Sequence, residues 1–177
     1  MLHKLLRCKG FLGSVRADRY RRKKMEPRPA LFYEGPHYMY SNFSSFMVDW
    51  RGRRWQTAEH AYQAEKFSED RARHVEKRIE KARSAHEAKK IAKEFEAYKR
   101  PDWDSVKLGV MEQILRAKLA QHEYIRKKLL ETGERLIVED SPTDNFWGRG
   151  PDWKGANHLG KLWMKLRAEL RSGAFVY

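Results

Sequence analysis

Apolar residues recur at helical spacing along much of the chain and predict a largely helical fold. The clearest pattern begins at Pro101-Asp102, which is a helix start signal. Its apolar residues follow the 3.6-residue period: Val106, Val110, Met111, Ile114, Leu115 and Ala117. No other segment has so continuous an apolar stripe, so we expect this segment to be the core helix.

Further helices are predicted from end signals combined with apolar spacing. They cover residues 57–67, the two parts of 70–98 on either side of Ser84, about 123–131, and the amphipathic stretch from 157 to 173. Thr57, Ser84 and Asn157 are the expected N-terminal caps, and Ser84-Ala85-His86-Glu87 has the form of a capping box. The two helices within 70–98 have thin apolar stripes, so most of their surface should be solvated.

Short strands and loops fill the remaining sequence. Residues 31–33 and 136–138 are apolar triplets typical of strands, whereas 35–55 and 142–155 are rich in aromatic, Gly, Asn and Asp residues and indicate loops. The fold class predicted from these patterns is α+β and predominantly helical, a single compact domain over residues 31–173 with a few short strands. Residues 1–30 are predicted to be a basic, flexible N-terminal arm.

Charge changes this picture in one respect. The chain of 177 residues carries 38 Lys and Arg against 24 Asp and Glu, a formal net charge of +14. Residues 1–30 contribute +8 and residues 70–100 contribute +5, so the rest of the chain is nearly neutral. These two segments could bind a nucleic acid, or the charge could only keep the protein in solution.

Location and redox state follow from what the sequence lacks. No apolar run reaches the length of about 20 residues that a membrane helix needs, so no membrane partner is expected. The start of the chain has no secretory apolar region, and a basic arm is favoured over a mitochondrial presequence. Cys8 is the single cysteine, which excludes a disulfide within the chain, and a reducing cytoplasm is the expected location.

Two segments carry residues suited to chemistry. On the helix that follows Thr57, Glu59, Gln63 and Lys66 share one face at about 100° per residue. This face is either an exposed polar surface or a buried polar site, and the pattern leaves both open. The segment 144–160 brings Trp, Gly, Asp and Asn residues before a helix N-terminus, which is typical of a pocket but equally of a structural loop.

Taken together, ordered motifs in this sequence resemble the YbiA-like, or NADAR, family of N-glycosidases. The resemblance covers about residues 31–171 and rests on these motifs: Ser41-Asn42-Phe43, Trp55-x-Thr57-x-Glu59-His60-Ala-Tyr62-Gln63-x-x-Lys66, Asp102-Trp103, Ala117-Lys118, Val138-Glu139, Asp144-x-x-Trp147-Gly148-x-Gly150 and Gly155-x-Asn157-x-Leu159-Gly160. Leu119 and His122 depart from the residues that the family often has there, which affects pocket details and leaves the reaction class unchanged.

The resemblance implies hydrolysis of an N-glycosidic bond between a base-like ring and a phosphorylated ribose. The substrate would be a ribosylaminopyrimidine phosphate of riboflavin biosynthesis, or ADP-ribose attached to guanine. The implied catalytic residues are Glu59, Trp103, Asp144 and Lys66, and the implied substrate-binding residues are Asn42, Phe43, Gln63, Trp147, Gly148, Arg149 and Asn157. No metal and no cofactor are expected. The competing hypotheses are a non-catalytic nucleic-acid-binding or ADP-ribose-binding protein; the sequence does not indicate an oligomeric state.

Overall fold

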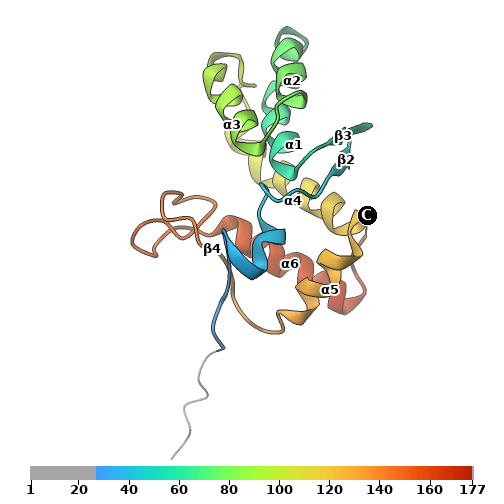
Figure 1. The fold of residues 1–177 in the computed structure, drawn as a ribbon, viewed down its shortest axis with the longest axis vertical. Coiled ribbons are helices and arrows are strands. Elements are labelled where there is room, and N and C mark those ends of the chain that lie inside the picture. The colour runs from blue at the N-terminus through green and yellow to red at the C-terminus, as the bar shows by residue number, and fades with distance from the viewer. Residues whose placement is uncertain (1–26, 177) are drawn as a thin grey trace, which may run out of the picture.

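Helices make up most of the molecule in the computed structural model, which describes residues 27–176 (Figure 1). They are α1 (Ala58–Ala64), α2 (Arg73–Glu80), α3 (Ala85–Glu94), α4 (Trp103–Gln121), α5 (Glu123–Glu131) and α6 (His158–Ser172). Single turns of 3₁₀ helix occur at η2 (Glu65–Phe67), η3 (Asp70–Ala72) and η4 (Glu96–Tyr98), and a longer one at η1 (Gly35–Tyr40). The predicted α+β, mainly helical class is confirmed.

Two small sheets complete the fold. β1 (Ala30–Phe32) pairs in parallel with β4 (Ile137–Glu139), and β2 (Val48–Trp50) forms an antiparallel hairpin with β3 (Arg53–Trp55). Arg51 and Gly52 turn this hairpin with φ values of 49° and 74°, as a two-residue hairpin turn requires. The pairing of β1 with β4 places the segment after residue 32 beside the segment after residue 139.

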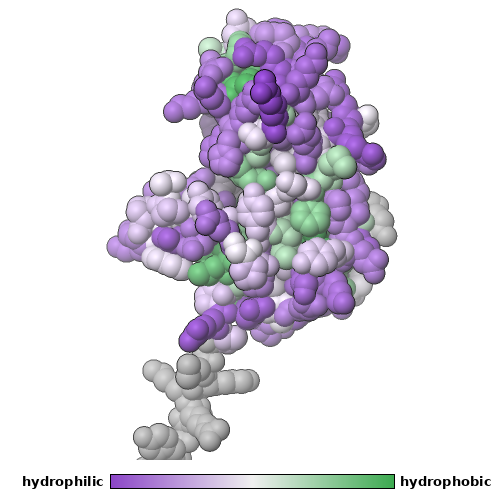
Figure 2. All heavy atoms as spheres, in the orientation of Figure 1, coloured by the Kyte–Doolittle hydropathy of each residue, from purple (hydrophilic) through white to green (hydrophobic). Residues whose placement is uncertain are grey.

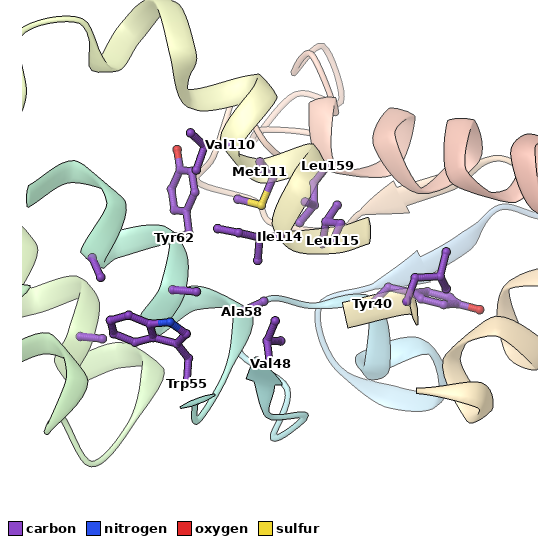
Figure 3. Packing of buried hydrophobic residues seen from close by; sticks show 14 of the residues in the cluster. Tyr40, Val48, Trp55, Ala58, Tyr62, Val110, Met111, Ile114, Leu115 and Leu159 are labelled. Atoms are coloured by element: carbon purple, nitrogen blue, oxygen red, sulfur yellow. The ribbon is translucent and has the colours of Figure 1, made fainter. Parts of the chain in front are cut away.

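The core forms around α4, as the apolar pattern predicted. Figure 3 shows residues of α4 meeting α1, β2 and α6; those labelled include Met111, Ile114, Leu115, Ala58, Tyr62, Val48 and Leu159. Met111, Ile114 and Leu115 are at most 1% exposed. Burial of such side chains stabilises the fold by about 1.5–3 kcal/mol each. Because α1 packs against α4, the residues on α1 are held against the buried core.

Helices α2 and α3 form a hairpin that packs on α1 at the top of Figure 1. The hydroxyl of Ser84 accepts a hydrogen bond from the Glu87 N–H, while the Glu87 carboxylate accepts one from the Arg83 N–H. The expected break at Ser84 is therefore confirmed. Figure 2 shows hydrophilic residues over most of this lobe, in agreement with the solvated surfaces that the sequence predicts.

Asn157 departs from its expected role as a helix cap. It precedes α6 with φ of 49°, but its side chain makes no hydrogen bond to that helix. Instead its amide donates to the Ile137 carbonyl (3.0 Å) and accepts from the Glu139 N–H (3.0 Å). The predicted local cap is thus replaced by two hydrogen bonds to β4, a segment about twenty residues earlier in the chain. Asn157 thus ties α6 to β4.

The expected arm largely lies outside the described residues, which begin at residue 27. Residues 27–29 have no regular structure, and Ala30, which the sequence analysis assigned to the arm, already belongs to β1. Within residues 27–176, no helix is both long and apolar enough to cross a membrane.

Candidate functional site

A cleft of about 690 Å³ opens beside α3, between the segment that follows β1 and the loop that follows β4. These segments adjoin because β1 pairs with β4. The lining comes from three parts of the chain: Tyr33, Glu34, Gly35, Tyr38, Ser41 and Phe43 after β1; His86 and Lys89 on α3; and Glu139, Ser141, Thr143 and Asp144 at β4 and beyond. Two of the predicted site residues, Phe43 and Asp144, line this cleft.

Glu59 and Gln63 lie buried on α1, which decides the question that the sequence left open. They are 5% and 3% exposed, and the Gln63 amide donates to the Glu59 carboxylate over 2.7 Å. The Glu59 N–H in turn donates to the Asn42 carbonyl (3.0 Å). The side-chain oxygens of Asn42 and Gln63 are buried with no hydrogen-bond partner in the structure. Because such groups are costly to bury unpaired, both are suited to accept hydrogen bonds from a ligand.

The charge of Glu59 links it electrostatically to the cleft. Burial raises the pKa of Glu59, while the Gln63 hydrogen bond and the nearby Lys89 and Lys66 lower it; Asp144 raises it further. Glu59 and Asp144 are therefore close enough to repel each other. A buried carboxyl group with a raised pKa is suited to accept a proton during a reaction.

Lys66 follows α1 and extends over aromatic rings. Its Nζ lies 5.9 Å from the ring centre of Tyr62 and 5.8 Å from that of Trp103. Tyr62 packs between Trp103 (centroids 5.0 Å apart) and Trp147 (5.6 Å). Burial lowers the pKa of Lys66, and the charge of Glu59 opposes this effect. The aromatic cluster thus brings together three of the predicted site residues: Lys66, Trp103 and Trp147.

Asp144 turns the loop after β4. Its Oδ1 accepts hydrogen bonds from the N–H groups of Phe146 (2.8 Å) and Trp147 (2.7 Å). These bonds fix the orientation of the carboxyl group, and Asp144 lines the cleft. Elsewhere in the cleft lining, the ring of Phe43 lies edge-on to that of His86, with ring centres 4.8 Å apart. The Nζ of Lys89 lies 5.8 Å from the centre of the Phe43 ring.

Three predicted binding residues have structural partners and do not line the cleft. A Cβ atom on Gly148 would lie 2.9 Å from the Cβ of Ser141, so Gly148 permits close packing of the loop. Arg149 forms an ion pair with Asp140 and lies over the Trp153 ring at 4.5 Å. Asn157 is engaged with β4, as described above. Direct contact of these residues with a substrate stays a prediction.

Sequence reasoning missed Glu139 and Lys89 as site residues. Glu139 ends β4 and lines the cleft, and its Oε2 is buried with no hydrogen-bond partner. Burial, followed by the charges of Asp144 and Glu59, raises the pKa of Glu139 to about 8. An acidic residue at the end of an apolar strand was the available signal. Lys89 gave no such signal because it lies among many exposed lysines of the same helix.

Comparison with known proteins places the chain among characterised relatives. Residues 31–171 match the NADAR domain family. The chain is 39% identical over 137 residues to N-glycosidase Npun_R5314 of Nostoc punctiforme, covering 77% of this chain and 88% of that protein. It is 37% identical over 131 residues to N-glycosidase YbiA of Escherichia coli, covering 74% and 80%.

Two further comparisons agree with these matches. Riboflavin biosynthesis protein VVA0006 of Vibrio vulnificus is 34% identical over 155 residues, which cover 86% of this chain and 41% of that longer protein. The NMR structure of E. coli YbiA superposes with a TM-score of 0.75 at 33% identity, covering 86% of this chain and 90% of that one. The chain therefore belongs to the NADAR domain family, and it is an N-glycosidase.

Proposed function

We propose that the protein hydrolyses the N-glycosidic bond between a base-like ring and a phosphorylated ribose, and that the reaction takes place where α1 meets the cleft. The observation that carries the proposal is the buried pair of Glu59 and Gln63, which shares an electrostatic environment with Asp144 and Lys89. A cleft of about 690 Å³ is large enough for a nucleotide-sized ligand. Two relatives named as riboflavin biosynthesis proteins support a ribosylaminopyrimidine phosphate as the first substrate to test.

Glu59 is the proposed residue on the ribose side. Breaking the bond between the anomeric carbon and nitrogen leaves positive charge on the ribose ring, which a nearby carboxylate stabilises. The same carboxylate can take a proton from the attacking water. Gln63 holds Glu59 by its 2.7 Å hydrogen bond, so the carboxyl group needs no reorganisation when charge develops.

Asp144 and the aromatic residues are proposed to orient the substrate. The second oxygen of Asp144, which receives neither of the two loop N–H groups, can accept a ribose hydroxyl. Trp103 and Trp147 frame Tyr62, and these rings, together with Phe43, offer surfaces for a planar base. Lys89, exposed on the cleft wall, is suited to attract the phosphate.

Lys66 has two candidate roles in this scheme. It could form a Schiff base with an opened ribose, for which burial and a lowered pKa are favourable. Alternatively, its positive charge keeps Glu59 ionised. We favour the electrostatic role, because the Lys66 ammonium lies over two aromatic rings and stabilises a nearby carboxylate in its charged form.

Direct measurement of base release tests the proposal. The purified protein is incubated with ribosylaminopyrimidine phosphate, with ADP-ribosylated guanosine and with ADP-ribosylated DNA, and the products are identified by mass spectrometry. Release of the free base from at least one of them, abolished by Glu59→Ala, is the expected result. Binding without release from any of the three would instead support the alternative, a non-catalytic ADP-ribose- or nucleic-acid-binding protein.

A nucleic-acid partner is a second, separate proposal. Exposed basic side chains gather on η3, α2, the turn between α2 and α3, and α3, which also provides a cleft wall: Arg71, Arg73, Lys77, Arg78, Lys81, Arg83, Lys89, Lys90 and Lys93. This surface could hold the phosphates of a nucleic acid whose modified base enters the cleft. It would favour the substrate attached to DNA or RNA over a small nucleotide.

A further inference from the structure

Three carboxyl groups act on one another electrostatically: Glu139 and Asp144, which line the cleft, and Glu59, which is buried on α1. Glu59 comes from α1, Glu139 from the end of β4, and Asp144 from the loop beyond it. The charges of Glu59 and Asp144 both raise the pKa of Glu139, so the three groups lie within electrostatic range. Burial and the repulsion between neighbouring carboxylates favour the protonated form of a carboxyl group in such a cluster.

The hydrogen bonds indicate which group retains a proton. Asp144 accepts hydrogen bonds from two backbone N–H groups, and Glu59 accepts one from the Gln63 amide, which lowers the pKa of Glu59. Glu139 has no equivalent donor at Oε2, which is buried and has no partner in the structure. A protonated carboxyl group is better suited to this position than a charged one, because a buried charge without a donor is strongly disfavoured.

The backbone of Glu139 is fixed on both sides. Its N–H donates to the Asn157 side chain (3.0 Å), and its carbonyl accepts from the Arg149 N–H (3.0 Å). The Glu139 side chain is therefore held by a strand rather than by a free loop, as precise proton transfer requires.

We propose that Glu139 is the general acid of the reaction and protonates the departing base. This inference rests on the proposed function. As the bond between the anomeric carbon and nitrogen breaks, its electron pair goes to the nitrogen, which takes the proton of Glu139. Water adds to the anomeric carbon and gives its proton to Glu59. Transfer of that proton to Glu139 restores the enzyme, and the net reaction consumes one water. Asp144 is then free to bind the ribose hydroxyls.

The charged groups around Glu139 agree with this role. Burial, Asp144 and Glu59 raise its pKa to about 8, and Lys89 on α3 opposes them. Glu34 and His86 also line the cleft. At neutral pH Glu139 is thus mostly protonated but able to lose its proton, which is the condition for an efficient acid.

The test compares wild type with Glu139→Gln on ribosylaminopyrimidine phosphate, the first substrate to test. An amide of the same shape cannot transfer a proton, so kcat should fall by about 10²–10⁴-fold. The wild-type kcat/KM should decline above about pH 8, and this alkaline decline should be absent from the variant. A base that already carries a positive charge leaves without being protonated. The variant should therefore retain near wild-type activity on a ribosyl phosphate with such a base. Glu123→Gln, an exposed change on α5, is the matched control.

Each outcome decides the inference. Wild-type kcat in Glu139→Gln overturns it, and so does an equal loss of activity on the neutral and the cationic base, since that loss would be structural. If Glu59→Gln is inactive while Glu139→Gln is normal, the inference fails and the proposed function stands. If Glu59→Gln is fully active, the proposed role of Glu59 fails; if the wild type releases no base from any of the three substrates, the proposed function itself fails.

Discussion

The ammonium of Lys118 donates a 2.9 Å hydrogen bond to the carbonyl oxygen of Ser41, 77 positions earlier in the chain. Two further bonds, to the Met39 carbonyl and the Ser44 hydroxyl (both 2.8 Å), use the other N–H groups of the ammonium. Lys118 is fully buried in α4, and burial lowers its pKa to about 7. It thereby attaches the segment that carries Asn42 and Phe43 to the core helix.

Replacing Lys118 with Met should therefore affect both stability and substrate binding. Three buried acceptors would lose their donor, and we expect the free energy of unfolding to fall by about 3 kcal/mol, measured by urea denaturation. Because the segment carrying Asn42 and Phe43 would loosen, KM should rise by about tenfold, as for a lost binding contact of about 1.4 kcal/mol. Lys161→Met, an exposed change on α6, should alter neither quantity. A loss of Vmax at unchanged KM would mean that Lys118 stabilises the fold without positioning the site.

Glu59→Gln is expected to fold normally, because the new amide can still hydrogen bond with Gln63. Loss of the charge should nevertheless lower kcat by about 10²–10⁴-fold, since the variant can neither stabilise the ribose cation nor accept a proton. Steady-state kinetics with mass-spectrometric detection measures this change. Near wild-type turnover would contradict the central assignment.

For Lys66, the electrostatic role predicts a shift in pH dependence. The positive charge of Lys66 lowers the pKa of Glu59, so Lys66→Met should raise it. Activity that needs ionised Glu59 should then begin at a higher pH than in wild type. Borohydride treatment during turnover should leave Lys66 unmodified. A reduced ribosyl adduct on Lys66, found by peptide mass spectrometry, would establish the Schiff-base role instead.

The proton on Glu139 should also be visible in stability measurements without any substrate. An unfolded glutamate has its pKa near 4.5, whereas the folded value is about 8. Below pH 4.5 both states are protonated, and between pH 4.5 and 8 only the unfolded state loses the proton, so folding becomes less favourable as pH rises. Glu139→Gln removes this dependence. The Tm of wild type relative to the variant should therefore fall between pH 4.5 and 8 and then stay level.

Deleting residues 1–28 tests the nucleic-acid proposal and ends before β1. If the arm recruits DNA or RNA, activity on ADP-ribosylated DNA should fall, while activity on a small nucleotide should not change. The advantage of wild type should also shrink as salt rises, because phosphate contacts are screened. Equal activity on DNA at low salt would leave the arm without a role in substrate capture.

Sequence patterns within a few neighbouring residues predicted the helices well, but they predicted the candidate site only in part. Thr57 and Ser84 cap their helices as expected, because a cap depends on residues within one turn. Glu139 and Lys118 were not recognised as functional, because their surroundings come from segments far away in the chain. A buried lysine in an amphipathic helix looks like any surface lysine until the loop that accepts its hydrogen bonds is in place.

The pairing of β1 with β4 also determines when during folding the site can form. The two strands are separated by more than one hundred residues, so the first wall of the cleft takes its position only after β4 has been synthesised. Contacts of such long range form slowly and late in folding. Loss of either strand would remove both walls from their positions at once. A chain that lacks either strand is thus expected to have no activity, rather than a reduced rate.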